Sequence, residues 1–237
     1  MRLNKFLAHC GVDSRRKCDE LIFEGRVQID GETFTNPGAQ FDELHSEVRV
    51  DGEIVKLKSV FTYIKMHKPR GFVTSRKDPH NPQTVMDLLP KVMHVMPVGR
   101  LDKDTTGILL FTDDGDLNYS LTHPKHGVKK EYEVLLHRAP EGFPEKELQH
   151  GIILEDNGDR VRGIAKALNR KRTHYRVTLT EGKKREVKRI FRHYNTRVYR
   201  LHRNTFAGLS VNELPPGKWR KLTPQEITQL KKTAGIS

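Results

Sequence analysis

The amino-acid sequence predicts an α+β protein with a small N-terminal helix–helix–strand module and a larger domain, whose mostly antiparallel mixed sheet is flanked by helices. Two amphipathic helical patterns precede the first strand pattern. Beyond residue 60, strands and helices lack the regular alternation of a doubly wound parallel sheet. The charge also changes: residues 1–60 hold 9 Lys and Arg against 11 Asp and Glu, whereas residues 61–237 hold 34 against 19. We therefore expect two domains, residues 1–58 and 61–237.

Two helices and two strands are expected in the N-terminal module. Apolar side chains recur in residues 3–10 at the i, i+3, i+4, i+7 spacing of an amphipathic helix. Ser14 is a suitable N-cap for a second helix, and Gly25 suits the residue after its end. Residues 27–29 and 48–50 alternate apolar with polar side chains and each precede an Asp-Gly pair, which is typical of strands entering tight turns.

The larger domain is expected to begin with a strand, a turn and a short helix. Residues 61–66 have the strand pattern, and residues 68–71 contain the Pro and Gly of a turn. Thr84 can cap a short helix with Asp87 at its third position, and Pro90 ends it.

Residues 98–115 are the most informative stretch of the chain. Arg100 and Asp102 lie between two glycines, four apolar residues follow at 108–111, and residues 113–115 form an Asp-Asp-Gly turn. This pattern predicts a loop that delivers Arg100 and Asp102 into a cleft, followed by a buried strand. The local sequence alone favours a plainer role for Asp102, as a turn former that hydrogen-bonds its own backbone.

The remaining elements are expected in the C-terminal half. A helix with an apolar stripe and basic residues on its sides and outer face, among them Lys188, is predicted at residues 187–194. A capping box at residues 223–226 predicts a final helix. Strands are predicted at residues 131–136, 175–179, 198–201 and 206–211.

The net charge of +13 indicates a polyanionic partner. Residues 170–203 hold 13 basic residues against two glutamates, and such a block is typical of nucleic-acid binding rather than of a merely solvated surface. No apolar run approaches membrane-spanning length, and the first residues lack a signal-peptide core. Cys10 and Cys18 fall in apolar helical stripes, which favours buried, reduced thiols. We expect a monomeric, cytoplasmic protein that does not contact membranes.

Several chemistries lack their sequence signatures. The chain contains no phosphate-binding loop ending in Lys-Ser or Lys-Thr and no Gly-x-Gly-x-x-Gly. Its histidines lack the spacing of zinc ligands. No cofactor and no metal are therefore expected. Asp102 and Asp104 leave a glycosidase open, provided that both carboxylates face one cleft about 5–9.5 Å apart.

Five further segments carry a family resemblance. They are residues 99–107 (GRLDKDTTG), 130–132 (KEY), 181–189 (EGKKREVKR), 198–203 (VYRLHR) and 214–223 (LPPGKWRKLT). In this order they resemble the RsuA-type ribosomal RNA pseudouridine synthases. Most of the N-terminal module, from Arg2 to Gly31, resembles an S4-type RNA-binding domain. The two resemblances together cover nearly the whole chain.

The resemblance implies that one uridine of ribosomal RNA, expected in the small subunit, is converted to pseudouridine. The bond between N1 and C1′ breaks, the uracil turns while bound, and C5 bonds to C1′. The target base must leave its stack to be reached. The pocket must also exclude water, which would otherwise hydrolyse the detached sugar.

The resemblance also implies roles for the candidate catalytic residues. Asp102 would be the essential carboxylate, acting either as nucleophile on C1′ or as base at C2′. Lys188 would pair with Asp102 and favour its ionised form. Many related synthases hold Arg in this slot, whereas Lys fits the small-subunit branch. Lys lacks the bidentate fork of Arg, so Arg185 and Arg189 remain open as alternative partners and as substrate-binding residues.

Three further residues would contact the substrate. Tyr132 would stack on the flipped uracil or help to move its proton, and Leu201 would close the apolar side of the pocket. Arg100 would fill the gap that the base leaves, or hold a phosphate. Ordinary core packing is the alternative for Tyr132 and Leu201.

The N-terminal module is expected to contact phosphates of ribosomal RNA, either free or in an assembling ribosomal particle. Two other functions remain open: the same reaction on large-subunit RNA, and a non-catalytic RNA-binding role in ribosome assembly. The candidate contacts in the module are Arg2, Lys5, Arg15, Arg16, Lys17 and Arg26.

Overall fold

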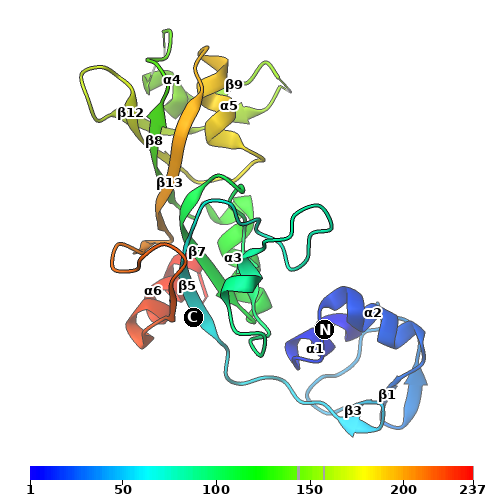
Figure 1. Ribbon diagram of the computed structural model, residues 1–237. Helices are drawn as coiled ribbons and strands as arrows, with labels where there is room; N and C mark the ends of the chain where they lie inside the picture. Colours follow the sequence, from blue (N-terminus) through cyan, green and yellow to red (C-terminus); the bar gives the residue numbers. More distant parts are fainter. Residues whose placement is uncertain (143–144, 157, 237) are drawn as a thin grey trace. The chain divides into compact units, whose positions relative to one another are not determined.

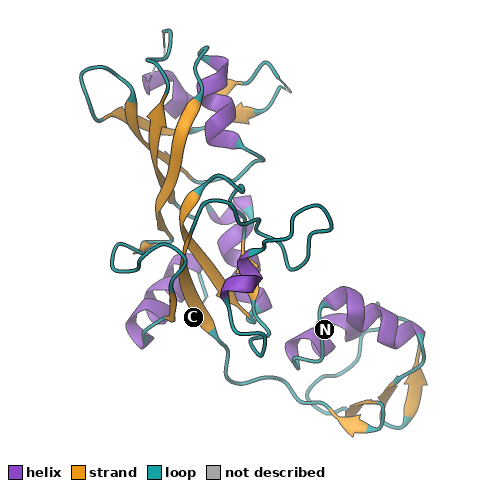
Figure 2. Cartoon of the chain, viewed as in Figure 1, coloured by secondary structure: helices purple, strands orange, loops and turns teal. Residues whose placement is uncertain are grey.

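The computed structural model describes residues 1–142, 145–156 and 158–236, which fall into two compact units, Met1–Phe61 and Thr62–Ser237. Both units combine helices with strands, so the predicted α+β class is confirmed (Figures 1 and 2). Among the described residues, no helix has both the length and the apolar character needed to cross a membrane.

The first unit packs two helices against a small antiparallel sheet. Its elements are α1 (Leu3–His9), α2 (Arg15–Phe23), β1 (Val27–Ile29), β2 (Glu32–Phe34), β3 (Val48–Val50) and β4 (Glu53–Ile54), with the strands in the order β2-β1-β3-β4. Leu7, Ile22 and Val27 are fully buried in one apolar cluster that joins helices and sheet. Ser14 caps α2 by accepting a hydrogen bond from the backbone N of Lys17 at 3.3 Å. The predicted helices and strands of this module are therefore confirmed.

A nine-stranded sheet organises the described part of the second unit. Seven strands follow the order β11-β12-β8-β13-β7-β5-β15, while β14 pairs with β13 and β6 pairs with β7. All pairings are antiparallel except that of β13 with β7, which confirms a mostly antiparallel mixed sheet. The strands are β5 (Tyr63–Lys68), β6 (Met96–Val98), β7 (Thr106–Thr112), β8 (Lys130–Leu136), β11 (Gly163–Ala167), β12 (His174–Leu179), β13 (Val198–Phe206), β14 (Leu209–Ser210) and β15 (Trp219–Lys221).

Helices flank this sheet at both of its ends. Figure 1 shows α4 and α5 beside β8, β12 and β13, and α6 beside β5. Helix α5 packs through Val187, Ile190 and Phe191, which are buried in the main apolar cluster together with strand residues such as Val134. The remaining elements are α3 (Gly115–Thr122), α4 (Glu145–His150), α5 (Glu186–His193), α6 (Pro224–Ala234), the 3-10 helices η1 (Val85–Leu88) and η2 (Pro124–His126), and a two-stranded sheet of β9 (Ile152–Ile153) and β10 (Arg160–Val161).

The parallel pair of β7 and β13 brings the central loop close to the C-terminal strands. Gly107 pairs with Arg203, and a Cβ on Gly107 would lie 2.2 Å from the carbonyl oxygen of Arg203. The φ angle of Gly107 is also +110°, a value that side-chain-bearing residues rarely adopt. Glycine is therefore required here, and it fixes where the loop that precedes β7 meets β13.

Two strand predictions need correction. The strand predicted at residues 61–66 is β5, Tyr63–Lys68, so the turn predicted at 68–71 begins only after Lys68. The strands predicted at residues 198–201 and 206–211 are instead one long strand, β13, and a short partner, β14. Ala207 and Gly208 both have positive φ angles, which place a hairpin turn between β13 and β14.

Other elements were not predicted. The Asp-Asp-Gly sequence predicted as a closing turn begins helix α3, because the side chain of Asp114 accepts a hydrogen bond from the backbone N of Leu117 at 3.0 Å. Elements α4, β9, β10 and β11 lie in a stretch whose sequence pattern is weak. By contrast, the predicted capping boxes at Thr84 and Thr223 are both present.

Candidate active site

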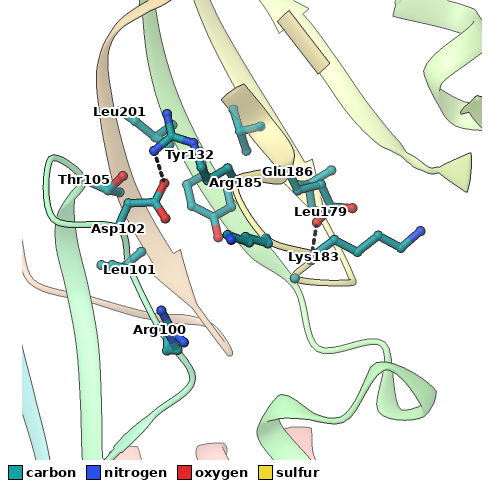
Figure 3. Close-up of a pocket in the computed structure, with 13 residues that line it drawn as sticks. Arg100, Leu101, Asp102, Thr105, Tyr132, Leu179, Lys183, Arg185, Glu186 and Leu201 are labelled. Carbon is teal, nitrogen blue, oxygen red and sulfur yellow. Dashed lines mark hydrogen bonds and ion pairs between the residues drawn. The ribbon is translucent and has the colours of Figure 1, made fainter. Parts of the chain in front are cut away.

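A cavity of about 380 Å³ lies within the second unit. Its walls come from the loop before β7, from strands β8, β12 and β13, and from the turn that leads into α5 (Figure 3). Its lining is divided between polar and apolar side chains, as expected of a site that binds a small polar ring. The lining residues are Arg100, Leu101, Asp102, Thr105, Tyr132, Leu179, Gly182, Lys183, Lys184, Arg185, Glu186, Val187 and Leu201.

The Asp102 carboxylate is held at this cavity by cations from the α5 region. Lys188 Nζ donates a hydrogen bond to Asp102 Oδ2 at 2.8 Å. Arg185 NH1 lies 3.8 Å from the same oxygen, and Figure 3 shows these two side chains facing each other. Arg185 precedes α5 with a left-handed φ of +52°, which turns the chain at the cavity wall. Two cations from the α5 region therefore hold the Asp102 carboxylate in place at the cavity.

Lys188 differs from its predicted position on the sides or outer face of α5. Its side chain is only 8% exposed. The loop that carries Asp102 and Asp104 meets this part of the helix, and Lys188 Nζ also donates to Asp104 Oδ1. Burial alone would raise the pKa of Asp104, but the hydrogen bond and the positive charge of Lys188 outweigh this effect, so the pKa is lowered.

A second lysine supports the loop from inside the protein. Lys68 is fully buried at the end of β5, and its ammonium donates to the carbonyl oxygens of Thr105 at 2.9 Å, Pro69 at 3.1 Å and Lys103 at 3.4 Å. Burial lowers its pKa to about 8, although the charges of Asp104 and Asp102 oppose this change. These bonds fix the backbone on both sides of Asp104.

Tyr132 and Leu201 form the buried apolar wall of the cavity. They project from the neighbouring strands β8 and β13, and their exposed fractions are 8% and 6%. Burial raises the pKa of the Tyr132 phenol. The nearby Arg203 guanidinium acts in the opposite direction, but the effect of burial is larger. Arg203 is itself buried and donates to the carbonyl oxygen of Ile108 from Nε at 2.9 Å and NH2 at 2.7 Å. Arg203 thereby links the tyrosine to strand β7.

Glu186 closes the turn that forms one side of the cavity. Its Oε2 accepts a hydrogen bond from the backbone N of Lys183 at 3.1 Å (Figure 3). Burial, together with the neighbouring carboxyl of Glu181, raises the pKa of Glu186 to about 8. Its carboxyl group therefore carries a proton at neutral pH for much of the time.

The structure brings most of the predicted site residues together, with one exception. Arg100, Asp102, Tyr132, Arg185 and Leu201 line the cavity, and Lys188 bonds Asp102. Arg189, predicted to bind substrate or to pair with Asp102, lies outside the lining. Its guanidinium pairs with Asp156 and Asp159, each at 2.8 Å. Arg189 has different partners from Lys188 because adjacent positions of a helix face in different directions.

The glycosidase alternative does not fit this geometry. Asp102 and Asp104 both bind the Lys188 ammonium, so a cation lies where a sugar would have to bind. Asp104 is also absent from the residues that line the cavity. In the described part of the chain, no group of three or more His, Cys, Asp or Glu side chains is arranged to hold a metal ion.

Basic side chains gather on the helices of the first unit. Arg15, Arg16 and Lys17 are exposed in the first turn of α2, and Arg2 is exposed just before α1, where Lys5 lies half-buried. Arg26 differs from the others. Its Nε and NH2 donate to Asp51 at 2.8 Å and 2.6 Å, which ties two turns of the sheet together.

Sequence reasoning missed three residues of the site. Asp104 was considered only as part of a glycosidase, Lys68 was placed in a turn, and the burial of Glu186 was not foreseen. The signal for Lys68 was weak: a lysine that ends an apolar strand directly before a proline. Asp104 lies two residues after Asp102, a spacing that allows two side chains of one loop to bind the same group. This spacing was the available signal that both carboxylates bind Lys188.

Comparisons with known proteins identify the family of both units. Residues 62–193 match the family described as RNA pseudouridylate synthase, and residues 1–43 match the S4 domain. A protein of Aquifex aeolicus (strain VF5) named "Uncharacterized RNA pseudouridine synthase" is 36% identical over 245 residues, which cover 100% of this chain and 96% of that protein. "Ribosomal large subunit pseudouridine synthase B" of Bacillus subtilis (strain 168) is 35% identical over 238 residues, covering 98% of this chain and 96% of that protein.

A solved structure extends the agreement to the fold. The structure described as "Crystal structure of pseudouridylate synthase" superposes with a TM-score of 0.70 at 28% identity, covering 97% of this chain and 99% of that one. The resemblance found in the sequence motifs is thereby confirmed over both units. The chain belongs to the RsuA-type RNA pseudouridine synthase family and carries an S4 domain in its N-terminal unit.

Proposed function

We propose that this protein isomerises one uridine of ribosomal RNA to pseudouridine, with Asp102 as its essential carboxylate. The observation that carries the proposal is the ion pair of Asp102 with the buried Lys188, at a cavity walled by Tyr132 and Leu201. This arrangement places a carboxylate that is ion-paired with a buried ammonium beside an apolar surface on which a uracil can stack. The cavity of about 380 Å³ is within the range that binds small ligands.

The reaction needs only these protein groups and the RNA. Asp102 attacks C1′ or removes a proton from C2′, and the N1–C1′ electron pair leaves with the uracil. The detached uracil turns against Tyr132 and Leu201, and its C5 bonds to C1′. In the nucleophile route this breaks the ester bond between Asp102 and C1′; in the base route Asp102 returns the proton to C2′. C5 then loses its hydrogen as a proton, and N1 gains one, so the product is an isomer of the substrate. The buried side chains of Tyr132 and Leu201 limit the access of water to the detached sugar, which protects it from hydrolysis.

The RNA subunit is the finer part of the proposal. Many related synthases have Arg at the position of Lys188, whereas Lys fits the small-subunit branch. Small-subunit RNA is therefore the substrate expected from the sequence. Large-subunit RNA is the second candidate, since the Bacillus subtilis relative is named a large-subunit synthase and is 35% identical. The exposed Arg2, Arg15, Arg16 and Lys17 of the S4 domain supply phosphate contacts for either RNA.

The test uses ribosomal RNA transcripts that carry tritium at uridine C5. Pseudouridine formation expels this hydrogen, so the radioactivity released into water reports the reaction. Small- and large-subunit transcripts, with and without ribosomal proteins, are incubated with the wild type and with Asp102→Ala. We expect release near one equivalent from one of the two RNAs by the wild type, and none by the variant.

The same experiment identifies the competing function. A non-catalytic assembly factor would bind the RNA or the particle but release no tritium. Full activity of Asp102→Ala would instead contradict the role given to that residue. Sequencing the modified position then decides between the two subunits.

A further inference from the structure

The Lys188 ammonium is shared between two carboxylates. It donates to Asp102 Oδ2 at 2.8 Å and, on the other side, to Asp104 Oδ1. The three side chains differ in exposure: 8% for Lys188, 30% for Asp102 and 49% for Asp104. Only Asp102 lines the cavity, so Asp104 binds the lysine from outside the substrate site. The ion pair of Lys188 with Asp102 therefore has a second carboxylate, Asp104, beside it.

The extra charge becomes important when Asp102 reacts. As a nucleophile, Asp102 becomes an ester at C1′; as a base, it becomes a carboxylic acid. In both routes it loses its negative charge while Lys188 stays buried. A buried ammonium without an anionic partner is strongly unfavourable, and Arg185 cannot compensate it because Arg185 is also a cation. Without a second carboxylate, the buried Lys188 charge would therefore oppose the step in which Asp102 loses its negative charge.

We infer, on the basis of the proposed function, that Asp104 is a positioning residue of the isomerisation, which keeps Lys188 paired while Asp102 gives up its charge. Lys188 has three N–H donors and no rigid fork, so two carboxylates can hold it in one place where one would let it rotate. When the Asp102 charge falls, the ammonium remains hydrogen-bonded to Asp104. The lysine then stays in position to stabilise Asp102 when the carboxylate is released.

The surroundings of Asp104 support this role. The fully buried Lys68 holds the backbone on both sides of Asp104 through the carbonyl oxygens of Lys103 and Thr105. The charged groups around this loop include the cations Lys68, Lys188, Arg185 and Arg203 and the two aspartates. The anchored backbone fixes where the Asp104 carboxylate lies, and its charge also compensates Lys68. Solvent reaches half of Asp104, so its effect is moderated by screening.

A double-mutant cycle tests the inference. Asp104→Asn keeps the size of the side chain but removes its charge, and Lys188→Met removes the ammonium. The readout is the single-turnover rate of tritium release with enzyme in saturating excess over RNA, which separates the chemical step from binding. We expect Asp104→Asn to slow this step by about 10- to 100-fold, as for loss of a charged hydrogen bond, while RNA affinity is unchanged. In the Lys188→Met background, Asp104→Asn should slow it by no more than about twofold.

Asp104→Glu tests whether restoring the negative charge restores the rate. This variant also tests the inference if Lys188→Met is too slow for its rate to be measured. The longer carboxylate keeps the charge, so we expect it to recover at least about a third of the wild-type rate, unlike Asp104→Asn. Glu141→Gln is the matched control, because it removes an exposed carboxylate of the same unit that pairs with Arg138 away from the cavity. Thermal unfolding of each variant identifies loss of structure.

Three results would overturn the inference while leaving the proposed function intact. They are a wild-type rate for Asp104→Asn, equal losses for Asp104→Asn and Asp104→Glu, and additive losses in the cycle. Failure of the proposed function has a different signature, since the wild type itself would then release no tritium from any RNA or particle.

Discussion

At the scale of single residues, catalysis is expected to depend on Asp102 far more than on the groups around it. Asp102→Asn preserves the shape of the side chain and can still accept a hydrogen bond from Lys188, so the fold should be retained. The amide is neither nucleophile nor base, and we expect the single-turnover rate to fall by about 10³-fold or more. Tritium release measures the rate, and a gel-shift titration should show unchanged RNA affinity.

Glu186 offers a residue-scale test of the buried electrostatics. Its pKa is raised from 4.5 to about 8 by burial and by Glu181. Between these two pH values the unfolded chain releases this proton and the folded chain keeps it, so this group makes stability fall as pH rises from 4.5 to 8 and then level off.

Glu186→Gln should remove that fall, because the amide never ionises and its oxygen can still accept from the backbone N of Lys183. At pH 8.5 the variant should unfold about 2–8 °C above the wild type, which corresponds to 1–2 kcal/mol in a chain of this size. At pH 4.5 the two proteins should unfold together. Differential scanning calorimetry across the pH range makes the comparison. A constant difference at every pH would assign the effect to packing instead.

At the scale of elements, the pairing of β7 with β13 is the contact that depends most on one residue type. Gly107→Ala places a Cβ 2.2 Å from the Arg203 carbonyl oxygen, at a φ of +110°. The backbone must shift or the parallel pair must open, and we expect the variant to lose about 3 kcal/mol or more of stability. Urea unfolding measures this loss. Gly127→Ala, with a positive φ but open space around its Cβ, is the control for strain alone.

The same elements explain what local patterns could and could not predict. The stripe of Val187, Ile190 and Phe191 predicts α5 and its buried face because burial against a sheet imposes the helical period. Lys188 was placed on the wrong side because a helical pattern does not reveal the loop that covers the helix. That loop comes from 84 or more residues earlier in the chain. Long-range contacts of this kind leave no periodic signal in the sequence.

Segments with weak patterns were missed for another reason. Strand β11 contains a glycine and two alanines among its five residues, and it is recognisable only once it pairs with β12. Helix α3 begins at a glycine, which normally disfavours a helix, and depends on the Asp114 cap. Tertiary pairing and capping supplied what local propensity lacked. The cavity residues Asp102, Tyr132 and Leu201 were found through the family resemblance of the segments that contain them, and not through local patterns, which favoured a turn and core packing.

At the scale of the whole molecule, the two units are expected to contribute separately to binding and to turnover. The S4 domain carries exposed cations at the start of α2, whereas the cavity lies entirely within the second unit. Phosphate contacts contribute affinity that falls steeply with salt, because each one releases counterions from the RNA. Removing such contacts should therefore weaken binding and reduce its salt dependence, without changing the chemical step.

Arg15→Glu with Arg16→Glu is the pair of substitutions that tests this separation. Both side chains are exposed in the first turn of α2, and Ser14 continues to cap the helix, so the fold should persist. If each arginine contacts one phosphate, the slope of log K against log salt should decrease in magnitude by about 1.4–1.8. Fluorescence anisotropy at several salt concentrations measures the slope, and the single-turnover rate at saturating enzyme should equal that of the wild type. A slower chemical step at saturation would mean that the S4 domain also helps to place the uridine in the cavity.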